Sequence, residues 1–357
     1  MEIAINGNFM SRQITGIERY ARELTSYFND LLKENDDVTL LISPTAKNVP
    51  EYKNIKVQQI GASKCNSKRN GNGNGIIWEQ TALRRYLKEH KNSICLNLCN
   101  VAPLFVQPGV TVIHDIMCRV NPEDYKTLRN HMSRYWHMFQ YWYITRHEKA
   151  IITVSNFSKK EIEKYYPKAK GKIEVIPDAW QHVLKYKKTE NWQNKYPFLE
   201  DKQFFFSMST LSKNKNGKWI IEVAKRNPDC VFAMAGKHYE TEYKVFPKNV
   251  HMLGYITDED ACALIKHCRA FIFPSLYEGF GLPPLEALAL GAEVISSNTT
   301  SLPEILGDAV HYVDPLDYNI DIDRLSPIKT SDKEKTLEKY NWIESAKELY
   351  TLLGVLA

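Results

Sequence analysis

The sequence predicts an α/β protein built from two domains, each a parallel β-sheet flanked by helices. Short apolar runs alternate with helical patterns along the whole chain, which is typical of this class. The length of 357 residues exceeds what one hydrophobic core usually holds. With 43% hydrophobic and 25% charged residues, the composition is that of a globular protein. We expect two Rossmann-like units with a cleft between them, since such sheets bind ligands at the carboxyl ends of their strands.

Twelve short apolar runs predict the strands. The first half contains EIAIN (2–6), VTLLIS (38–43), SICLNL (93–98), VTVIHD (110–115), AIITVS (150–155) and IEVIP (173–177). The second half contains FFFSMS (204–209), VFAMAG (231–236), VHMLG (250–254), AFIFPS (270–275), AEVIS (292–296) and AVHYV (309–313). Helical patterns lie between them at 16–32, 78–91, 125–148 and 158–166, and an amphipathic helix is expected at 331–353.

Two polar stretches mark loops. Residues 66–75, NSKRNGNGNG, are the one low-complexity segment and predict a surface loop. Their glycines lack the strand–turn–helix context of a dinucleotide-binding fingerprint, so that interpretation is discarded. Residues 180–202 are rich in Lys, Asn and Trp and predict the linker between the domains.

The compartment is predicted from the N-terminus and the cysteines. MEIAINGNFM has no basic region followed by an apolar run, so no signal peptide is expected, and no segment has the length of a membrane span. The seven cysteines are scattered, and Cys95 and Cys99 lie in the apolar run ICLNLC, which favours buried thiols over metal ligands. We therefore expect a cytoplasmic protein with reduced cysteines.

Charge is unevenly distributed along the chain. Residues 1–180 hold 26 Lys and Arg against 18 Asp and Glu, a net of +8, whereas the remainder has a net of −3. A basic first half suits an anionic partner such as a membrane surface or a lipid-linked phosphate. A solvated lysine-rich surface explains the count equally well. Nucleic acid is disfavoured because no binding motif is present.

The segment FIFPSLYEGFGLPPLE, residues 271–286, carries the strongest chemical signal. A strand ends in a turn containing Gly279 and Gly281, and a helix with two prolines in its first turn follows. The unpaired N–H groups and the dipole of such a helix favour a phosphate. Carboxylates at Glu278 and Glu286 would repel phosphate but suit the hydroxyls of a ribose and a sugar. The alternative is an ordinary turn with two surface glutamates.

The run YWHMFQYWY, residues 135–143, places aromatic side chains at nearly every helical position. One buried face cannot hold them all. Core packing is expected to explain most of them, and contact with an acceptor or a lipid is the alternative.

Several segments together resemble the family-4 retaining glycosyltransferases, which have the GT-B fold. Residues 274–315 are similar to the family's nucleotide-sugar segment. Further matches occur in the family's order: TGIERYARELTSYF near the N-terminus, WEQ at 78–80, VIHDI at 112–116, ITVSNFSKKEI at 152–162, IEVIPD at 173–178 and the closing NWIESAKELY. The resemblance thus covers nearly the whole chain.

The resemblance implies three regions and a reaction. Residues 1–182 would form the acceptor-side domain, 183–335 the nucleotide-sugar domain, and 336–357 a helix that crosses back to the first domain. The implied enzyme transfers a hexose, with mannose or rhamnose favoured, from a nucleotide diphosphate sugar to a lipid-linked or oligosaccharide acceptor of a surface polysaccharide. Peripheral contact with the cytoplasmic membrane face is a further expectation. No Asp-x-Asp motif lies in a suitable place, so neither a metal nor a cofactor is expected.

The resemblance also assigns roles in donor binding. Glu286 matches the glutamate that binds the ribose hydroxyls, and Glu278 the one near the donor sugar. His114 matches a histidine that contacts the sugar near the reacting carbon, while packing in the strand end is the alternative. Backbone groups complete the donor contacts. Gly16 would let the diphosphate approach, Phe280, Gly281 and Leu282 would present N–H groups to it, and Gly279 would bind the donor as part of the same turn. Tyr255 and Ile256 would contact the base.

The phosphate clamp departs from the family pattern. In STLSKNKNG, Asn214 stands where the family has an arginine, Lys215 matches the lysine, and Ser209 replaces a glycine. Lysine is a point charge and lacks the guanidinium fork. Either Lys215 and Lys213 carry the charge that stabilises the leaving diphosphate, or another cation helps, or activity is reduced. His114 and Glu278 are expected as the other catalytic groups.

Two other functions remain open from the sequence. A nucleotide-sugar epimerase of the same architecture would use the same cleft without an acceptor. A partner subunit with weak or no catalysis would fit the altered clamp.

Overall fold

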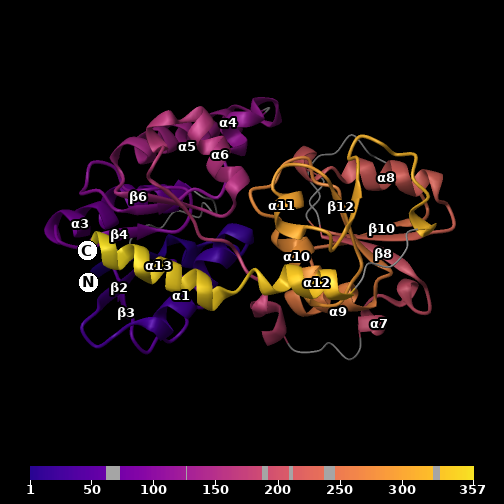
Figure 1. Ribbon diagram of the computed structural model, residues 1–357, viewed down its shortest axis with the longest axis horizontal. Helices are drawn as coiled ribbons and strands as arrows, with labels where there is room; N and C mark the ends of the chain where they lie inside the picture. Colours follow the sequence, from indigo (N-terminus) through magenta and orange to yellow (C-terminus); the bar gives the residue numbers. More distant parts are fainter. Residues whose placement is uncertain (62–72, 126, 187–191, 209–211, 237–245, 325–329) are drawn as a thin grey trace. The chain divides into compact units, whose positions relative to one another are not determined.

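A computed structural model describes residues 1–61, 73–125, 127–186, 192–208, 212–236, 246–324 and 330–357. The chain forms two compact units (Figure 1). The first consists of Met1–Asp178 together with Trp342–Ala357, and the second is Ala179–Asn341. Both are α/β units with a parallel sheet, as the sequence predicts.

The first unit contains a seven-stranded parallel sheet with the order β3-β2-β1-β4-β5-β6-β7. Its strands are β1 (Glu2–Asn6), β2 (Asp37–Ile42), β3 (Lys56–Gln59), β4 (Ile94–Asn97), β5 (Val110–Val112), β6 (Ala150–Thr153) and β7 (Ile173–Val175). The strand order reverses between β1 and β4, and ligands of such sheets bind beyond the carboxyl ends at this switch point.

The longer helices of this unit are α1 (Gly16–Leu31), α5 (Leu128–His147), α6 (Asn156–Tyr165) and α13 (Trp342–Leu356); the shorter ones are α2 (Gly73–Trp78), α3 (Arg84–Glu89) and α4 (Met117–Val120). A π-helical turn, η2 (Glu79–Leu83), joins α2 to α3. The last helix, α13, packs against α1 (Figure 1). Trp342 is fully buried with its ring 5.9 Å from that of Tyr20, and Tyr350 donates a 2.9 Å hydrogen bond to Asp36.

The second unit contains a six-stranded parallel sheet with the order β10-β9-β8-β11-β12-β13. Its strands are β8 (Phe204–Met208), β9 (Val231–Ala235), β10 (Val250–Gly254), β11 (Ala270–Phe273), β12 (Val294–Ser297) and β13 (His311–Val313). Helices α7 (Trp192–Lys195), α8 (Gly217–Arg226), α9 (Asp258–His267), α10 (Leu282–Ala289), α11 (Leu302–Leu306) and α12 (Thr330–Glu338) surround it. Its switch point lies between β8 and β11.

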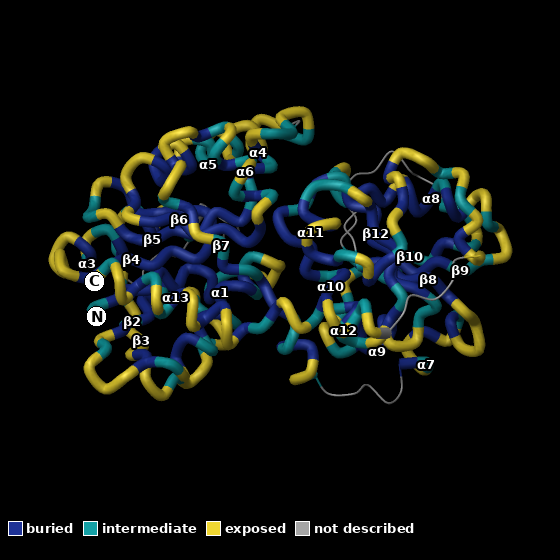
Figure 2. Tube along the Cα trace, in the orientation of Figure 1, coloured by how far each residue is buried: buried dark blue, intermediate teal, exposed yellow. Residues whose placement is uncertain are grey.

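Buried strands lie at the centre of each unit (Figure 2). In the second unit, Trp219 and Val223 of α8 pack on Phe205, Phe232 and other apolar residues of the sheet. Most of the strands are buried along most of their length, so they appear in the sequence as near-continuous apolar runs. All twelve predicted strands are present.

The structure differs from the sequence prediction at three places. The edge strand β3, KVQQ, was missed because all four of its residues are exposed and only one is apolar. The expected helix 331–353 is two helices, α12 and α13, since the chain leaves the second unit at Asn341. The described parts of the expected linker, 180–186 and 192–202, instead belong to the second unit, where Trp192 and Leu199 are buried. Most of the predicted loop 66–75 lies outside the described residues.

Within the described ranges, none of the helices combines the length and the apolar character that crossing a membrane requires.

Candidate donor site

The candidate site of the second unit lies where β8 and β11 end. The loop after β8 is fastened to the turn after β11, because the Leu276 amide donates to the Asn214 carbonyl at 2.7 Å. Asn216 has a left-handed backbone with φ of 55°, and its Nδ2 donates to the carbonyls of Pro274 at 3.1 Å and Pro315 at 2.9 Å. The lysine loop and the glycine turn therefore form one structural element.

This fastening brings Lys215 and Glu278 together. Lys215 Nζ lies 2.6 Å from Glu278 Oε1, and Ser275 Oγ lies 2.5 Å from the same oxygen. The side chains of Lys215 and Glu278 are 28% and 13% exposed, so a ligand can reach both. Lys215 also lies over the ring of Phe273, 5.4 Å from its centroid. The ion pair holds Oε1 and leaves Oε2 of Glu278 available to accept from a hydroxyl.

The turn itself is fixed by hydroxyl groups. Thr300 Oγ1 accepts from the Glu278 amide at 3.1 Å, and Ser301 Oγ lies 3.0 Å from the carbonyl oxygens of both Glu278 and Phe280. Gly281 has φ of 103°, and a Cβ there would lie 2.4 Å from Leu302 Cδ2, so only glycine fits. These contacts hold the backbone in one conformation before any ligand arrives.

Helix α10 begins at Leu282 with Gly281 as its N-cap residue. Among the residues that the structure describes, no hydrogen bond is made by the amides of Phe280, Gly281 or Leu282. Pro283 and Pro284 have no N–H to offer, so the donors are concentrated at the first residue and just before it. Free amides at a helix N-terminus suit an anion such as a diphosphate.

Glu286 is held by a residue that sequence reasoning missed. His182 Nε2 lies 2.6 Å from Glu286 Oε1, and the His182 side chain is only 1% exposed. The carboxylate accepts from the imidazole, which fixes its orientation and leaves Oε2 for a further donor. His182 was overlooked because it falls in the segment interpreted as a linker, and no local motif marks it.

The remaining donor candidates of this unit are less closely connected to these groups. Tyr255, which is 71% exposed, and the half-buried Ile256 follow the edge strand β10 at the same carboxyl edge of the sheet. Lys213 is exposed on the loop that carries Lys215. Asn214, where the arginine was expected, accepts at Oδ1 from Ser212 at 2.8 Å. Ser209 lies outside the described residues.

In the first unit, His114 follows β5 and is buried. Its Nε2 lies 2.9 Å from the Leu98 carbonyl, which can only accept, so this nitrogen carries the proton. Burial lowers the pKa of His114 to about 4, although the bond to Leu98 opposes that shift. The ring also meets Tyr20 edge-on at 4.9 Å. The imidazole is therefore neutral near pH 7, with Nδ1 as its acceptor.

Gly16 is the first residue of α1, after Thr15, whose backbone and hydroxyl both bond to Glu18. A Cβ at Gly16 would meet no heavy atom within 4 Å, and its φ is not positive. Neither packing nor backbone conformation requires a glycine here, in contrast to Gly281.

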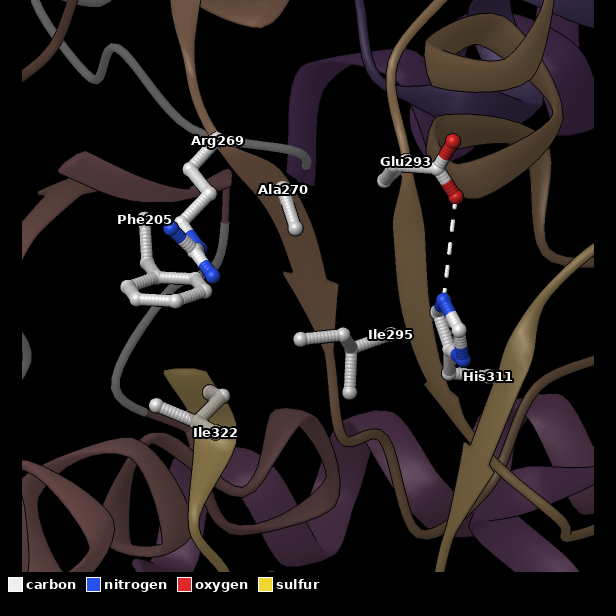
Figure 3. Close-up of a pocket in the computed structure, with 7 residues that line it drawn as sticks. All are labelled: Phe205, Arg269, Ala270, Glu293, Ile295, His311 and Ile322. Carbon is white, nitrogen blue, oxygen red and sulfur yellow. Dashed lines mark ion pairs between the residues drawn. The ribbon is translucent and has the colours of Figure 1, made fainter. Parts of the chain in front are cut away.

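The second unit also contains a cavity of about 160 Å³, which is separate from the candidate donor site. Figure 3 shows it lined by Arg269, Ala270, Glu293 and His311 together with Phe205, Ile295 and Ile322. Arg269 and Glu293 immediately precede β11 and β12, and His311 begins β13, so the cavity lies at the amino ends of the strands. It is at the opposite edge of the sheet from Glu278, and Glu293 is paired there with Lys333 and His311.

Family comparisons agree with the two-unit architecture. Residues 14–179 match Glycosyltransferase Family 4, and residues 188–319 match Glycosyl transferases group 1. Together these matches cover most of both units. The chain belongs to this family of glycosyltransferases.

Curated relatives share part of the chain. The serotype-specific mannosyltransferase WbdA of Escherichia coli is 29% identical over 222 residues, which cover 56% of this chain and 26% of WbdA. The O-antigen chain mannosyltransferase B of Escherichia coli is 28% identical over 263 residues, covering 65% of this chain and 64% of the relative. The chain thus spans about a quarter of one relative and under two thirds of the other.

Solved structures show the same fold. Sucrose-phosphate synthase from Thermosynechococcus elongatus aligns with a TM-score of 0.74 at 15% identity, covering 99% of this chain and 98% of that one. Anabaena HepE, solved with UDP and glucose, aligns with a TM-score of 0.65 at 15% identity, covering 99% of this chain and 100% of that one. The predicted GT-B fold is confirmed.

Proposed function

We propose that this glycosyltransferase transfers a hexose, with mannose favoured, from a nucleotide diphosphate sugar to a hydroxyl of a growing surface polysaccharide such as an O-antigen. The mannosyltransferase names of its relatives support the sugar. The observation that carries the proposal is the Lys215–Glu278 pair, 2.6 Å apart, beside the free amides that begin α10. A nucleotide diphosphate sugar needs a cation and an anion-binding turn for its diphosphate, and a carboxylate for its sugar hydroxyls.

The donor would bind along one carboxyl edge of the second sheet. The diphosphate would accept from the amides of Phe280, Gly281 and Leu282, with Lys215 supplying charge. Glu278 Oε2 would accept from a sugar hydroxyl, and Glu286 Oε2 from the ribose. Gly279 belongs to the same turn, Lys213 would add charge, and Tyr255 and Ile256 would edge the base. In the first unit, Gly16 and His114 are proposed as further donor contacts, with His114 acting through neutral Nδ1.

Chemistry would then depend on orientation and electrostatics. As the bond from the anomeric carbon to the diphosphate oxygen breaks, negative charge grows on the diphosphate, where Lys215 and the amides stabilise it. The acceptor oxygen attacks from the same face, and its proton passes to the leaving diphosphate oxygen. The sugar keeps its anomeric configuration, and no protein carboxylate acts as a nucleophile.

The acceptor is proposed to be lipid-linked or an oligosaccharide, and the enzyme to act in the cytoplasm at the membrane face. The excess of basic residues in the first 180 positions supports an anionic surface as partner.

A thermal-shift screen tests the donor. GDP-mannose, dTDP-rhamnose, UDP-glucose and ADP are added at equal concentration, and a ligand at about 100 times its Kd adds about 2.7 kcal/mol of stability. We expect one sugar nucleotide to raise the melting temperature by several degrees, and Glu286→Gln to reduce the shift. Equal, negligible shifts from all four would contradict the proposal. Release of an altered free sugar nucleotide, without transfer, would instead identify an epimerase.

A further inference from the structure

Helix α5 of the first unit exposes a continuous apolar stripe. Five large apolar side chains are between 40% and 78% exposed: Leu128, Met132, Tyr135, Phe139 and Trp142. Their spacing alternates between four and three residues, which at 3.6 residues per turn places all five within an arc of about 80°. The aromatic run in the sequence therefore does not pack entirely into the core.

The stripe is separate from the face that α5 buries. The buried residues of α5 lie in its C-terminal half, between Gln140 and Thr145, whereas residues 128–133 are all exposed. Tyr141 and Ile144 pack with Ile162 and Tyr166 in a core cluster, which already anchors α5. A surface helix normally presents polar residues on its second face, so an apolar second face indicates an interaction site.

Basic residues accompany the stripe. Helix α5 contains no Asp or Glu, and Arg146 lies 4.7 Å above the ring of Trp142. Residues 117–172 hold twelve Lys and Arg against five Asp and Glu, whereas the rest of the first 180 residues are nearly balanced at 14 against 13. The basicity of the first half is thus concentrated around α5.

A second basic feature lies on the neighbouring elements. Helix α6 and the turn after it, which packs against α5, form a hollow of about 340 Å³. Lys160, Lys164 and Lys170 line this hollow, with Glu163 as its only carboxylate. Clustered cations attract anionic head groups within about a Debye length of 10 Å.

We propose that the stripe on α5 docks the enzyme onto an anionic phospholipid bilayer, with the helix lying in the plane of the interface. Tryptophan, tyrosine and phenylalanine flanked by arginines are the composition of interfacial helices. A second copy of the chain is a poorer occupant, because pairing two α5 helices would bring their arginines together. Docking through α5 would hold the enzyme at the cytoplasmic membrane face. The use of such docking rests on the proposed transfer to a lipid-linked acceptor.

Vesicle co-sedimentation tests it with no sugar nucleotide present. The full chain is mixed with vesicles of phosphatidylcholine alone or of phosphatidylcholine and phosphatidylglycerol. We expect binding to the anionic vesicles that falls with added salt, and a loss of about tenfold or more in the double variant Phe139→Ser/Trp142→Ser. The matched control is Leu316→Ser/Val355→Ser, since these side chains are 70% and 80% exposed elsewhere. Far-UV circular dichroism and melting temperature show that each variant is folded.

Every other outcome overturns the proposal. No sedimentation with anionic vesicles, equal binding to neutral vesicles, or an equal loss in the control would each contradict it. A dimer in analytical ultracentrifugation that the stripe variant abolishes would assign the stripe to self-association. Because the assay needs no donor, a failed transferase proposal leaves its result unaffected.

Discussion

Lys215 Nζ lies 2.6 Å from Glu278 Oε1, so the cation expected on the diphosphate already has a carboxylate partner. The family's arginine is absent at Asn214, and the loop instead offers two lysines. Lys215 can serve the diphosphate without leaving Glu278, since an ammonium group has three protons to donate. The pair thus couples the sugar-binding carboxylate to the phosphate-binding charge.

Replacing Glu278 separates these two functions. In Glu278→Gln the amide cannot neutralise Lys215, so affinity for the nucleoside diphosphate should stay equal or become tighter. Transfer should fall by about 100-fold or more, because the sugar loses a charged acceptor. Calorimetry with the nucleoside diphosphate and steady-state kinetics measure the two effects. Glu338→Gln, at an exposed position of α12, is the control; weaker diphosphate binding in Glu278→Gln would contradict the coupling.

Removing Lys215 should weaken diphosphate binding, in contrast to replacing Glu278. Hydrogen bonds to charged groups contribute about 1.5–3 kcal/mol, so Lys215→Ala should weaken nucleoside diphosphate binding by about 10- to 100-fold. Lys213→Ala, on the same loop, should cost less because Lys213 is exposed. Asn214→Arg restores the family residue and should strengthen binding. An equal loss of nucleoside diphosphate affinity in the two lysine variants would show that Lys215 contributes no more to binding than Lys213.

His182 should act through Glu286. His182→Gln removes the imidazole that holds Oε1 at 2.6 Å and should weaken nucleoside binding by about 1 kcal/mol, or about fivefold. Calorimetry with the nucleoside and with inorganic pyrophosphate distinguishes the two halves of the donor. Only nucleoside binding should change. A loss of pyrophosphate affinity of the same size would assign His182 to general stability instead.

Two glycines provide a matched test of structural and binding roles. Gly281→Ala should destabilise the fold by about 1–3 kcal/mol, because its Cβ would meet Leu302 at 2.4 Å with φ at 103°. Gly16→Ala meets nothing within 4 Å and should stabilise α1 by about 0.4–1 kcal/mol while weakening donor binding. Melting temperature and donor affinity are measured for both. Unchanged donor affinity in Gly16→Ala would remove Gly16 from the proposed contacts.

His114 should make stability depend on pH. The unfolded chain protonates this histidine below about pH 6.5, whereas burial holds the folded pKa at about 4. The unfolded state therefore binds more protons in that window, and the wild type should lose about 3 kcal/mol of stability between pH 6.5 and pH 4. His114→Asn cannot titrate and should lack this component in urea unfolding curves. If the unfolding free energies of the wild type and His114→Asn changed with pH in parallel, the predicted contribution of His114 would be contradicted.

The sequence predicts most of the fold because most of the strands are largely buried and carry their own apolar runs. It fails at β3, whose exposed residues carry no such signal. The turn from Glu278 to Leu282 is recognisable from its glycines and prolines. The pairing of Glu286 with His182 is not, because 104 residues separate them and only the folded chain brings them together. For the same reason, no local pattern indicates that Lys215 would meet Glu278.

The return of α13 to the first unit has a consequence for synthesis of the chain. The first unit is discontinuous, since its buried Trp342 is made more than 160 residues after Asp178, whereas the second unit is one continuous segment. On the ribosome, the second unit can complete its core first, although domains usually fold in order from the N-terminus. The N-terminal half must wait, partly assembled, for the last helix to leave the exit tunnel.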